Sequence, residues 1–175
     1  MSRSALMIPT IINDNFFDDV DAVIKKVNSF EFHRLSKDRT APGERTLSLH
    51  LFDEEFFCYV MRNILVHYYG YQDLTFGKSI LHAHRIQPGD IFKNQFHTDT
   101  DIDDFEIAAV IYLSDGDIYS GTTILDDDKK QSIVVANKKN TMVAYDPARW
   151  HGPSKFSFDV ERLTLTAFIK DVKLS

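Results

Sequence analysis

Apolar residues recur at helical spacing in two segments near the start of the chain. The first segment covers residues 16–28 and the second covers residues 53–69, and each carries one stripe of apolar positions three or four residues apart. This spacing predicts two amphipathic helices. Asp14 or Asn15 is the expected N-cap of the first helix, and Gly70 follows the second helix as a stop signal.

The stretch between the two predicted helices, residues 31–46, has no periodic pattern. It contains the turn dipeptide Pro42-Gly43 and is the most basic part of the chain. We interpret this stretch as a loop or an irregular flap, and as a candidate lid over a site.

After Gly70 the pattern changes to short β-rich runs that are separated by turn residues. Their spacing, without helical segments between them, favours an antiparallel sandwich or barrel. The runs cover residues 78–86, 90–96, 106–114, 121–125, 131–136, 140–145 and 162–170. We therefore expect an α+β fold with a jelly-roll-like core and the two helices packed on one sheet.

The length of 175 residues fits one domain with a single core. Within residues 1–175, we expect residues 1–75 to form the helical support and the candidate lid. Residues 76–175 are expected to form the β core that carries the site. The sequence leaves the oligomeric state open.

Charge and cysteine content narrow the classes of function. The net charge of −6 disfavours nucleic acid as the main partner, because nucleic-acid-binding domains usually carry the opposite sign. Cys58 is the single cysteine, so no intrachain disulfide can form and the chain fits a reducing compartment. No apolar run is long enough for a membrane span or a secretory signal, so we expect a cytoplasmic protein without membrane contact.

The stretch FHTDTDI, residues 96–102, places His97 and Asp99 two positions apart. On a strand, side chains at this spacing leave on the same side. His151 follows later in AYDPARWHGPS, just before a Gly-Pro turn. Two histidines and one carboxylate can fill one face of an octahedral metal ion and leave three positions open, as in non-haem Fe(II) oxygenases. The alternative is a polar turn and an unrelated loop histidine.

A candidate anion site lies in the last apolar run, which begins with Arg162. Thr164 is two positions further on and shares its strand face, and a guanidinium with a neighbouring hydroxyl suits a carboxylate. Tyr112 could supply a third hydrogen bond. Plainer interpretations are a surface ion pair for Arg162 and ordinary strand preference for the other two residues.

These motifs stand in one order along the C-terminal half, in residues 86–99, 110–125, 142–154 and 160–169. Their order resembles that of the Fe(II)- and 2-oxoglutarate-dependent dioxygenases, and most closely the prolyl-4-hydroxylase-like branch. The resemblance implies a double-stranded β-helix, also called a jelly roll. It also implies an oxidoreductase that uses Fe(II), 2-oxoglutarate and O2.

The resemblance assigns roles to the candidate residues. Fe(II) would be held by His97, Asp99 and His151. The distal carboxylate of 2-oxoglutarate would pair with Arg162, assisted by Tyr112 and Thr164. Halogenating relatives replace the metal-binding carboxylate by a small residue, so the presence of Asp99 favours hydroxylation or a related oxidation.

The sequence departs from the prolyl-hydroxylase pattern at Ile86, where relatives often carry an aromatic residue that contributes to the cosubstrate pocket. We hypothesise that His84, on the same strand face, supplies a hydrogen bond into this pocket. In plainer interpretations, His82 and His84 are half-buried strand residues or a second metal-binding pair.

Three functions remain open on the sequence alone. The first is hydroxylation of a peptidyl residue, an amino acid or a small metabolite, with release of succinate and CO2. The second is oxidative demethylation of nucleic acid, but that branch typically carries a second arginine after the final one, and residues 163–173 offer only Lys170 and Lys173. The third is a non-catalytic β-helix protein that binds a metal or another ligand.

Overall fold

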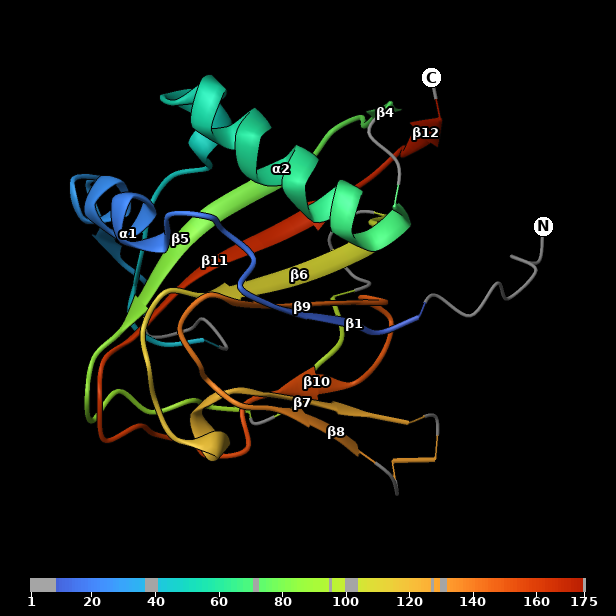
Figure 1. Ribbon diagram of the computed structural model, residues 1–175. Helices are drawn as coiled ribbons and strands as arrows, with labels where there is room; N and C mark the ends of the chain where they lie inside the picture. The colour runs from blue at the N-terminus through green and yellow to red at the C-terminus, as the bar shows by residue number, and fades with distance from the viewer. Residues whose placement is uncertain are drawn as a thin grey trace.

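The apolar runs form two antiparallel sheets that face each other in the computed structural model (Figure 1). The structure describes residues 9–36, 41–70, 73–94, 96–99, 104–126, 128–129 and 132–174. The larger sheet has seven strands. In spatial order these are β1 (Ile11–Asp14), β9 (Thr141–Tyr145), β6 (Ile107–Tyr112), β11 (Arg162–Ile169), β5 (Ile80–Ile86), β3 (Glu44–Arg45) and β2 (His33–Arg34).

The smaller facing sheet has three strands, and these are β10 (His151–Gly152), β7 (Thr122–Leu125) and β8 (Ser132–Val135). A separate pair joins β12 (Lys173–Leu174) to β4 (Leu74–Thr75). Two short 3-10 helices are η1 (Leu49–Leu51) and η2 (Ile118–Ser120). With the two α-helices described below, the chain combines helices with a large antiparallel sheet.

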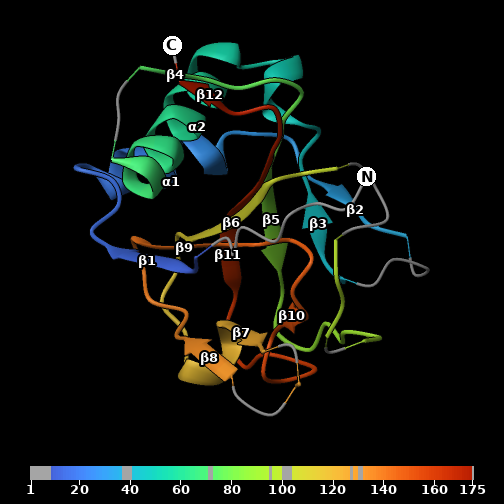
Figure 2. The same cartoon turned by 90° about the vertical axis from the view of Figure 1, so that its right-hand side faces the viewer.

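The larger sheet has two different faces, because side chains alternate along each strand. On β11, Leu163 and Leu165 join a core with the helices α1 (Val20–Asn28) and α2 (Glu54–Tyr69). Figures 1 and 2 show both helices on this side of the sheet and the three-stranded sheet on the other. The opposite face of the larger sheet therefore points toward the smaller sheet, and this is where polar side chains from β11 and β5 are found.

Helix α1 begins later than the sequence pattern predicts. Its N-cap is Asp19, whose side chain accepts a hydrogen bond from the backbone N–H of Ala22 at 2.9 Å. The expected caps, Asp14 and Asn15, were wrong. Asp14 ends strand β1, and the backbone amides that follow are held by Asn140 instead of entering a helix.

Helix α2 matches the predicted segment closely. Asp53 caps it by accepting from the N–H of Phe56 at 3.1 Å, and Asp53 also pairs with Lys26 of α1 at 2.7 Å. Gly70 ends the helix with a φ of 74°, a left-handed conformation that suits glycine. The described helices include none that is both long and apolar enough to cross a membrane.

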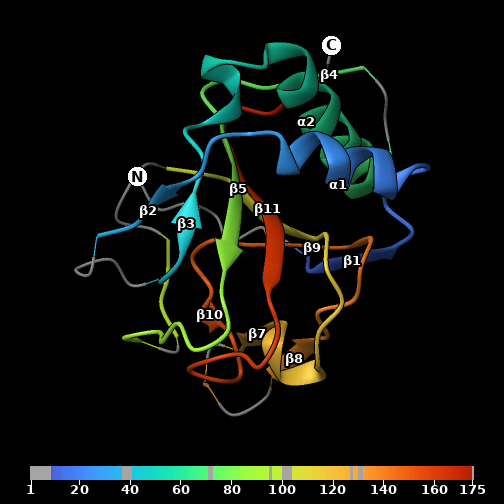
Figure 3. The ribbon, with the colours of Figure 1, turned by 90° about the vertical axis from the view of Figure 1, so that its left-hand side faces the viewer.

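Two predictions for the loops and strands were wrong. Residues 90–96 were expected to be a strand, but the described residues of this stretch form none, because Phe92 turns inward and packs with Ile86 and Phe158. The stretch 31–46 is also more than a loop. Its β2 and β3 extend the larger sheet beyond β5, as Figure 3 shows, while its residues 37–40 lie outside the described part.

We predict that Asp53→Ala lowers the free energy of unfolding by about 1 kcal/mol, because the N-terminal amides of α2 lose their cap. Urea denaturation followed by circular dichroism measures this change. Asp53→Asn keeps a capping oxygen and is expected to retain most of the stability. Equal losses in the two variants would show that the ion pair with Lys26, and not the cap, carries the effect.

Candidate metal centre

The structure brings His97, Asp99 and His151 together. A ligand atom from each of the three lies within 4.8 Å of the others, and no other such group of acidic, histidine or cysteine residues occurs among the described residues. The Nε2 atom of His151 lies 3.0 Å from one carboxylate oxygen of Asp99, and the Nε2 atom of His97 lies 3.6 Å from the other. The carboxylate therefore sits between the two imidazoles, with one nitrogen of each directed at it.

Backbone hydrogen bonds fix this arrangement. His97 and His151 form an isolated antiparallel bridge in which each N–H donates to the other's carbonyl, at 3.0 and 2.9 Å. The N–H of Asp99 donates to the carbonyl of Pro147 at 3.0 Å. His151 was expected in a turn, but it opens β10 and pairs with Ile124 of β7. Backbone hydrogen bonds thus hold each of the three candidate ligands.

The orientation of the His151 ring follows from its second nitrogen. Nδ1 lies 2.9 Å from the carbonyl oxygen of Arg149, and because a carbonyl can only accept, Nδ1 carries the proton. This leaves Nε2, the nitrogen that faces Asp99, as the candidate ligand atom. Burial, with a further contribution from His151, lowers the pKa of His97, which favours the neutral imidazole that binds metals.

A cavity of about 440 Å³ lies beside the three residues. Its walls come from both sheets, with Val110, Thr166 and Phe168 on the larger sheet and Thr122 on the smaller. Apolar groups make much of this wall. The charged groups of the wall are Asp99, Arg45 and Arg162 among the described residues.

Arg162 lies at the start of β11 and is buried, with 8% of its surface exposed. Its guanidinium lies over the ring of Tyr112, with 5.4 Å between its central carbon and the ring centroid. Its Nε is buried and has no hydrogen-bond partner among the described residues. A buried guanidinium is costly unless an anion compensates it, so this position fits the carboxylate of a ligand.

Tyr112 and Thr164 are both fully buried, and neither lines the cavity. The hydroxyl of Tyr112 donates to Thr122 at 2.6 Å and also lies near Arg162, and burial raises its pKa. The hydroxyl of Thr164 points to the backbone carbonyl of His84 at 3.5 Å. The structure therefore places Tyr112 next to Arg162, where it can orient the guanidinium, and the role of Thr164 stays a prediction.

His84 lies in the cavity wall, whereas His82 does not. The Nε2 of His84 donates to the carbonyl of Pro42 at 2.8 Å, and burial, reinforced by the charge of Arg45, lowers the pKa of His84 to about 3. Burial likewise lowers the pKa of His82 to about 4, and its ring contacts the carbonyl of Thr46. Both histidines are neutral and bonded to backbone, which fits a structural role better than a second metal pair.

The sequence pattern placed Arg45 only in the candidate lid, and the structure places it in the cavity wall. It stands on the two-residue strand β3, which pairs with β5. A strand of two residues is too short to show an alternation of apolar and polar side chains. The surrounding basic stretch was therefore interpreted as a loop. The pairing of this segment with β5, in which the hydroxyl of Thr46 accepts from the N–H of Ala83 and the N–H of Thr46 donates to the carbonyl of Ala83, was not visible in the sequence.

Comparison with known proteins identifies the fold. No protein-family profile and no curated protein sequence matches the chain. Among solved structures, a prolyl-4-hydroxylase of Pseudomonas putida is 15% identical, with 95% of this chain and 94% of that chain covered and a TM-score of 0.65. A 2OG-Fe(II) oxygenase family protein of Burkholderia pseudomallei is 13% identical, with coverages of 92% and 85% and a TM-score of 0.68.

A third similar structure is the non-haem α-ketoglutarate-dependent epimerase SnoN from nogalamycin biosynthesis. It is 12% identical, with 94% of this chain and 79% of that chain covered and a TM-score of 0.68. This chain therefore has the fold of these oxygenases. Because the named proteins include both a hydroxylase and an epimerase, the fold alone does not select a reaction.

We predict that Arg149→Met weakens the binding of Fe(II) about tenfold, because it releases the segment whose carbonyl orients His151. The Arg149 guanidinium bonds the carbonyl of Leu125 at 3.0 and 3.2 Å and the hydroxyl of Thr10 at 3.0 Å. Anaerobic calorimetric titration with Fe(II) measures the affinity. Arg62→Met, on the exposed side of α2, is the matched control, and equal affinities in the two variants would contradict the role of Arg149.

We also predict a pH effect from His84. Its pKa is about 3 in the folded protein against an ordinary value of 6.5, so the unfolded chain binds a proton that the folded chain excludes. Stability is therefore full above pH 6.5 and falls as the pH drops toward 3, by up to about 1.4 kcal/mol per pH unit.

Urea midpoints of the metal-free protein between pH 7 and about pH 4 test this effect. His84→Gln is expected to reduce the slope and to leave the contribution of His82, whose pKa is also lowered, whereas His33→Gln, at an exposed position, is expected to keep the wild-type slope. Parallel curves for His84→Gln and the wild type would show that the pKa of His84 is the same in the folded and unfolded protein.

Proposed function

We propose that this protein is an Fe(II)- and 2-oxoglutarate-dependent oxygenase that hydroxylates a peptidyl residue, an amino acid or a small metabolite and releases succinate and CO2. The observation that carries the proposal is the meeting of two features in one cavity. A set of two histidines and one carboxylate lies at one side, and the buried guanidinium of Arg162 lies in the same wall. The first feature suits a metal ion and the second suits a dicarboxylic cosubstrate.

The donor set fits iron. His97 and His151 offer neutral imidazole nitrogens and Asp99 offers a carboxylate oxygen, which is the facial arrangement that leaves three positions of an octahedral ion open. When bound, Fe(II) together with 2-oxoglutarate and O2 supplies the oxidising power for breaking a substrate C–H bond. Asp99 also supplies a negative charge that offsets half the charge of the ion.

The remaining work falls to the protein's own side chains. Arg162 would receive the distal carboxylate of the cosubstrate through charge-assisted hydrogen bonds, and Tyr112 would hold the guanidinium in place. Val110 and Phe168 line the cavity wall and keep water from the reacting groups. We further propose that the two facing sheets form a double-stranded β-helix, with α1 and α2 as its outer support.

The test is turnover of 2-oxoglutarate by the purified protein with Fe(II) and ascorbate in air, followed as succinate release. Slow release without an added substrate is expected, because many such sites consume the cosubstrate weakly on their own. The release is expected to stop in His97→Ala and in Asp99→Ala. A folded wild-type protein that binds Fe(II) and 2-oxoglutarate but never forms succinate would favour the non-catalytic binding protein.

We predict that Arg162→Met raises the concentration of 2-oxoglutarate needed for half-maximal succinate release at least tenfold, because a buried charge-assisted pair is lost. Fe(II) affinity is expected to change little, since Arg162 is no candidate ligand. Arg162→Lys keeps the charge and is expected to recover part of the effect. An unchanged 2-oxoglutarate requirement in Arg162→Met would place the cosubstrate elsewhere in the cavity.

A further inference from the structure

The cavity contains a second guanidinium whose position is set by the sheet. Arg45 of β3 lies opposite His84 of β5, and Arg162 of β11 lies opposite Ile86 of β5. His84 and Ile86 are two residues apart, so they share one face of β5. Arg45 and Arg162 therefore approach the same cavity from strands on either side of β5, with their Cα atoms about 12 Å apart as estimated from strand spacing and rise.

His84 separates the two arginines without adding a charge. Burial lowers its pKa most, and both Arg45 and Arg162 lower it further, which shows that both guanidiniums act on the same ring. Arg45 lines the same cavity as His97 and Asp99, so its charge faces the metal-binding side of the cavity. The positive potential thus extends from Arg162 past His84 to the region beside the candidate ligands.

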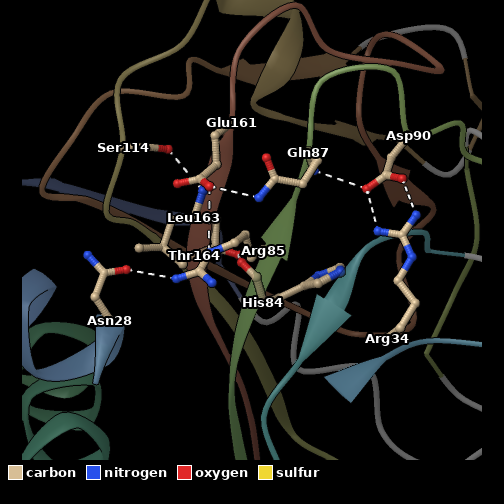
Figure 4. Close-up of polar contacts among 10 residues, drawn as sticks. All are labelled: Asn28, Arg34, His84, Arg85, Gln87, Asp90, Ser114, Glu161, Leu163 and Thr164. Atoms are coloured by element: carbon tan, nitrogen blue, oxygen red, sulfur yellow. Dashed lines mark hydrogen bonds and ion pairs between the residues drawn. The ribbon is translucent and has the colours of Figure 1, made fainter. Parts of the chain in front are cut away.

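Arg85, the residue after His84 on β5, lies on the opposite face of the strand from the cavity. Figure 4 shows His84 and Arg85, adjacent on β5, pointing in different directions, with Arg85 directed at Asn28 of α1. Arg85 also packs over the ring of Phe32, on the helix-bearing side of the sheet. Arg85 therefore carries the same charge as Arg45 but cannot reach a ligand in the cavity, which makes it a matched control.

The second guanidinium adds a positive group to the cavity wall, apart from the position of Arg162. Arg45 stands in the same wall, where its charge acts on whatever binds beside the cosubstrate. A positive group at this place attracts a negative group and disfavours a positive one.

We propose that Arg45 binds a carboxylate of the primary substrate, so that the substrate is a small carboxylic acid such as a free amino acid. This inference rests on the proposed function and narrows it. A carboxylate held at Arg45, with the metal on the far side of the bound molecule, would present the carbon chain to the open metal positions. A residue inside a peptide lacks a free α-carboxylate and would not be selected in this way.

The experiment uses the full chain loaded with Mn(II) and N-oxalylglycine, an unreactive analogue of 2-oxoglutarate. The probes are free L-amino acids and other short carboxylic acids, each tested beside its own carboxamide. Mn(II) broadens the NMR signals of molecules that bind near it, so the broadening reports binding in this cavity. We expect at least one acid to bind tenfold or more tightly than its amide.

The variants then assign the preference to a residue. Arg45→Met is expected to abolish the difference between acid and amide, Arg45→Lys to keep part of it, and Arg85→Met to keep all of it. Equal binding of every acid and its amide by the wild type would overturn the inference, and so would a preference that survives in Arg45→Met. An Arg45→Met protein that loses N-oxalylglycine binding would also overturn it, because Arg45 would then be a cosubstrate residue.

A separate control distinguishes this failure from failure of the proposed function. Anaerobic Fe(II) and 2-oxoglutarate are added to the wild type and to Arg45→Met, and the visible absorption of the chelate is recorded. Absorption in both proteins without any acid preference would overturn the role of Arg45 alone. Lack of absorption in the wild type would overturn the oxygenase proposal itself.

Discussion

The backbone bridge between His97 and His151 is the interaction on which the candidate site depends. The two residues are far apart in the sequence, and their paired hydrogen bonds hold the two ring-bearing segments side by side. Asp99 follows His97 by two positions and is tied by its own N–H to Pro147, in the segment that precedes His151. One short stretch of antiparallel pairing therefore positions all three candidate ligands, and Arg149 braces the same segment from outside.

The larger sheet supplies the rest of the cavity through its alternation. Side chains such as Leu163 and Leu165 bury one face against α1 and α2, which fixes the register of β11. The residues between them then have to face the other way, toward the smaller sheet. Arg162 reaches the cavity for this reason, and His84 does so on β5. The helices thus affect the site indirectly: they cover one face of the larger sheet, and the candidate site lies on the other face.

Much of this architecture could be predicted from the sequence because it depends on local patterns. The stripe of α2 and its stop at Gly70 are local signals, and the short β-rich runs predict β5, β6, β9 and β11. The metal set could be proposed because His97, Asp99 and His151 stand in motifs whose order is informative. Their backbone bridge, however, is a contact between distant segments.

The features that escaped prediction depend on tertiary contacts. The start of α1 is set by Asn140, which binds the amides before the helix from the far end of the chain. Residues 90–94 resemble a strand, but Phe92 is drawn into a cluster with Ile86 and Phe158. Arg45 enters the cavity because β3 pairs with β5, and two residues carry no periodic signal. Thr164 lies on the strand face of Arg162 and is fully buried between β5 and β6, and its role at a ligand stays a prediction.

The central claim is that one cavity holds Fe(II) and 2-oxoglutarate together. It is tested most directly by adding both, without oxygen, to the metal-free protein and recording the weak visible absorption of their chelate. The account predicts a band that needs both components and is lost in His151→Ala. A folded wild-type protein that shows no band, or a His151→Ala protein that keeps it, would contradict the account.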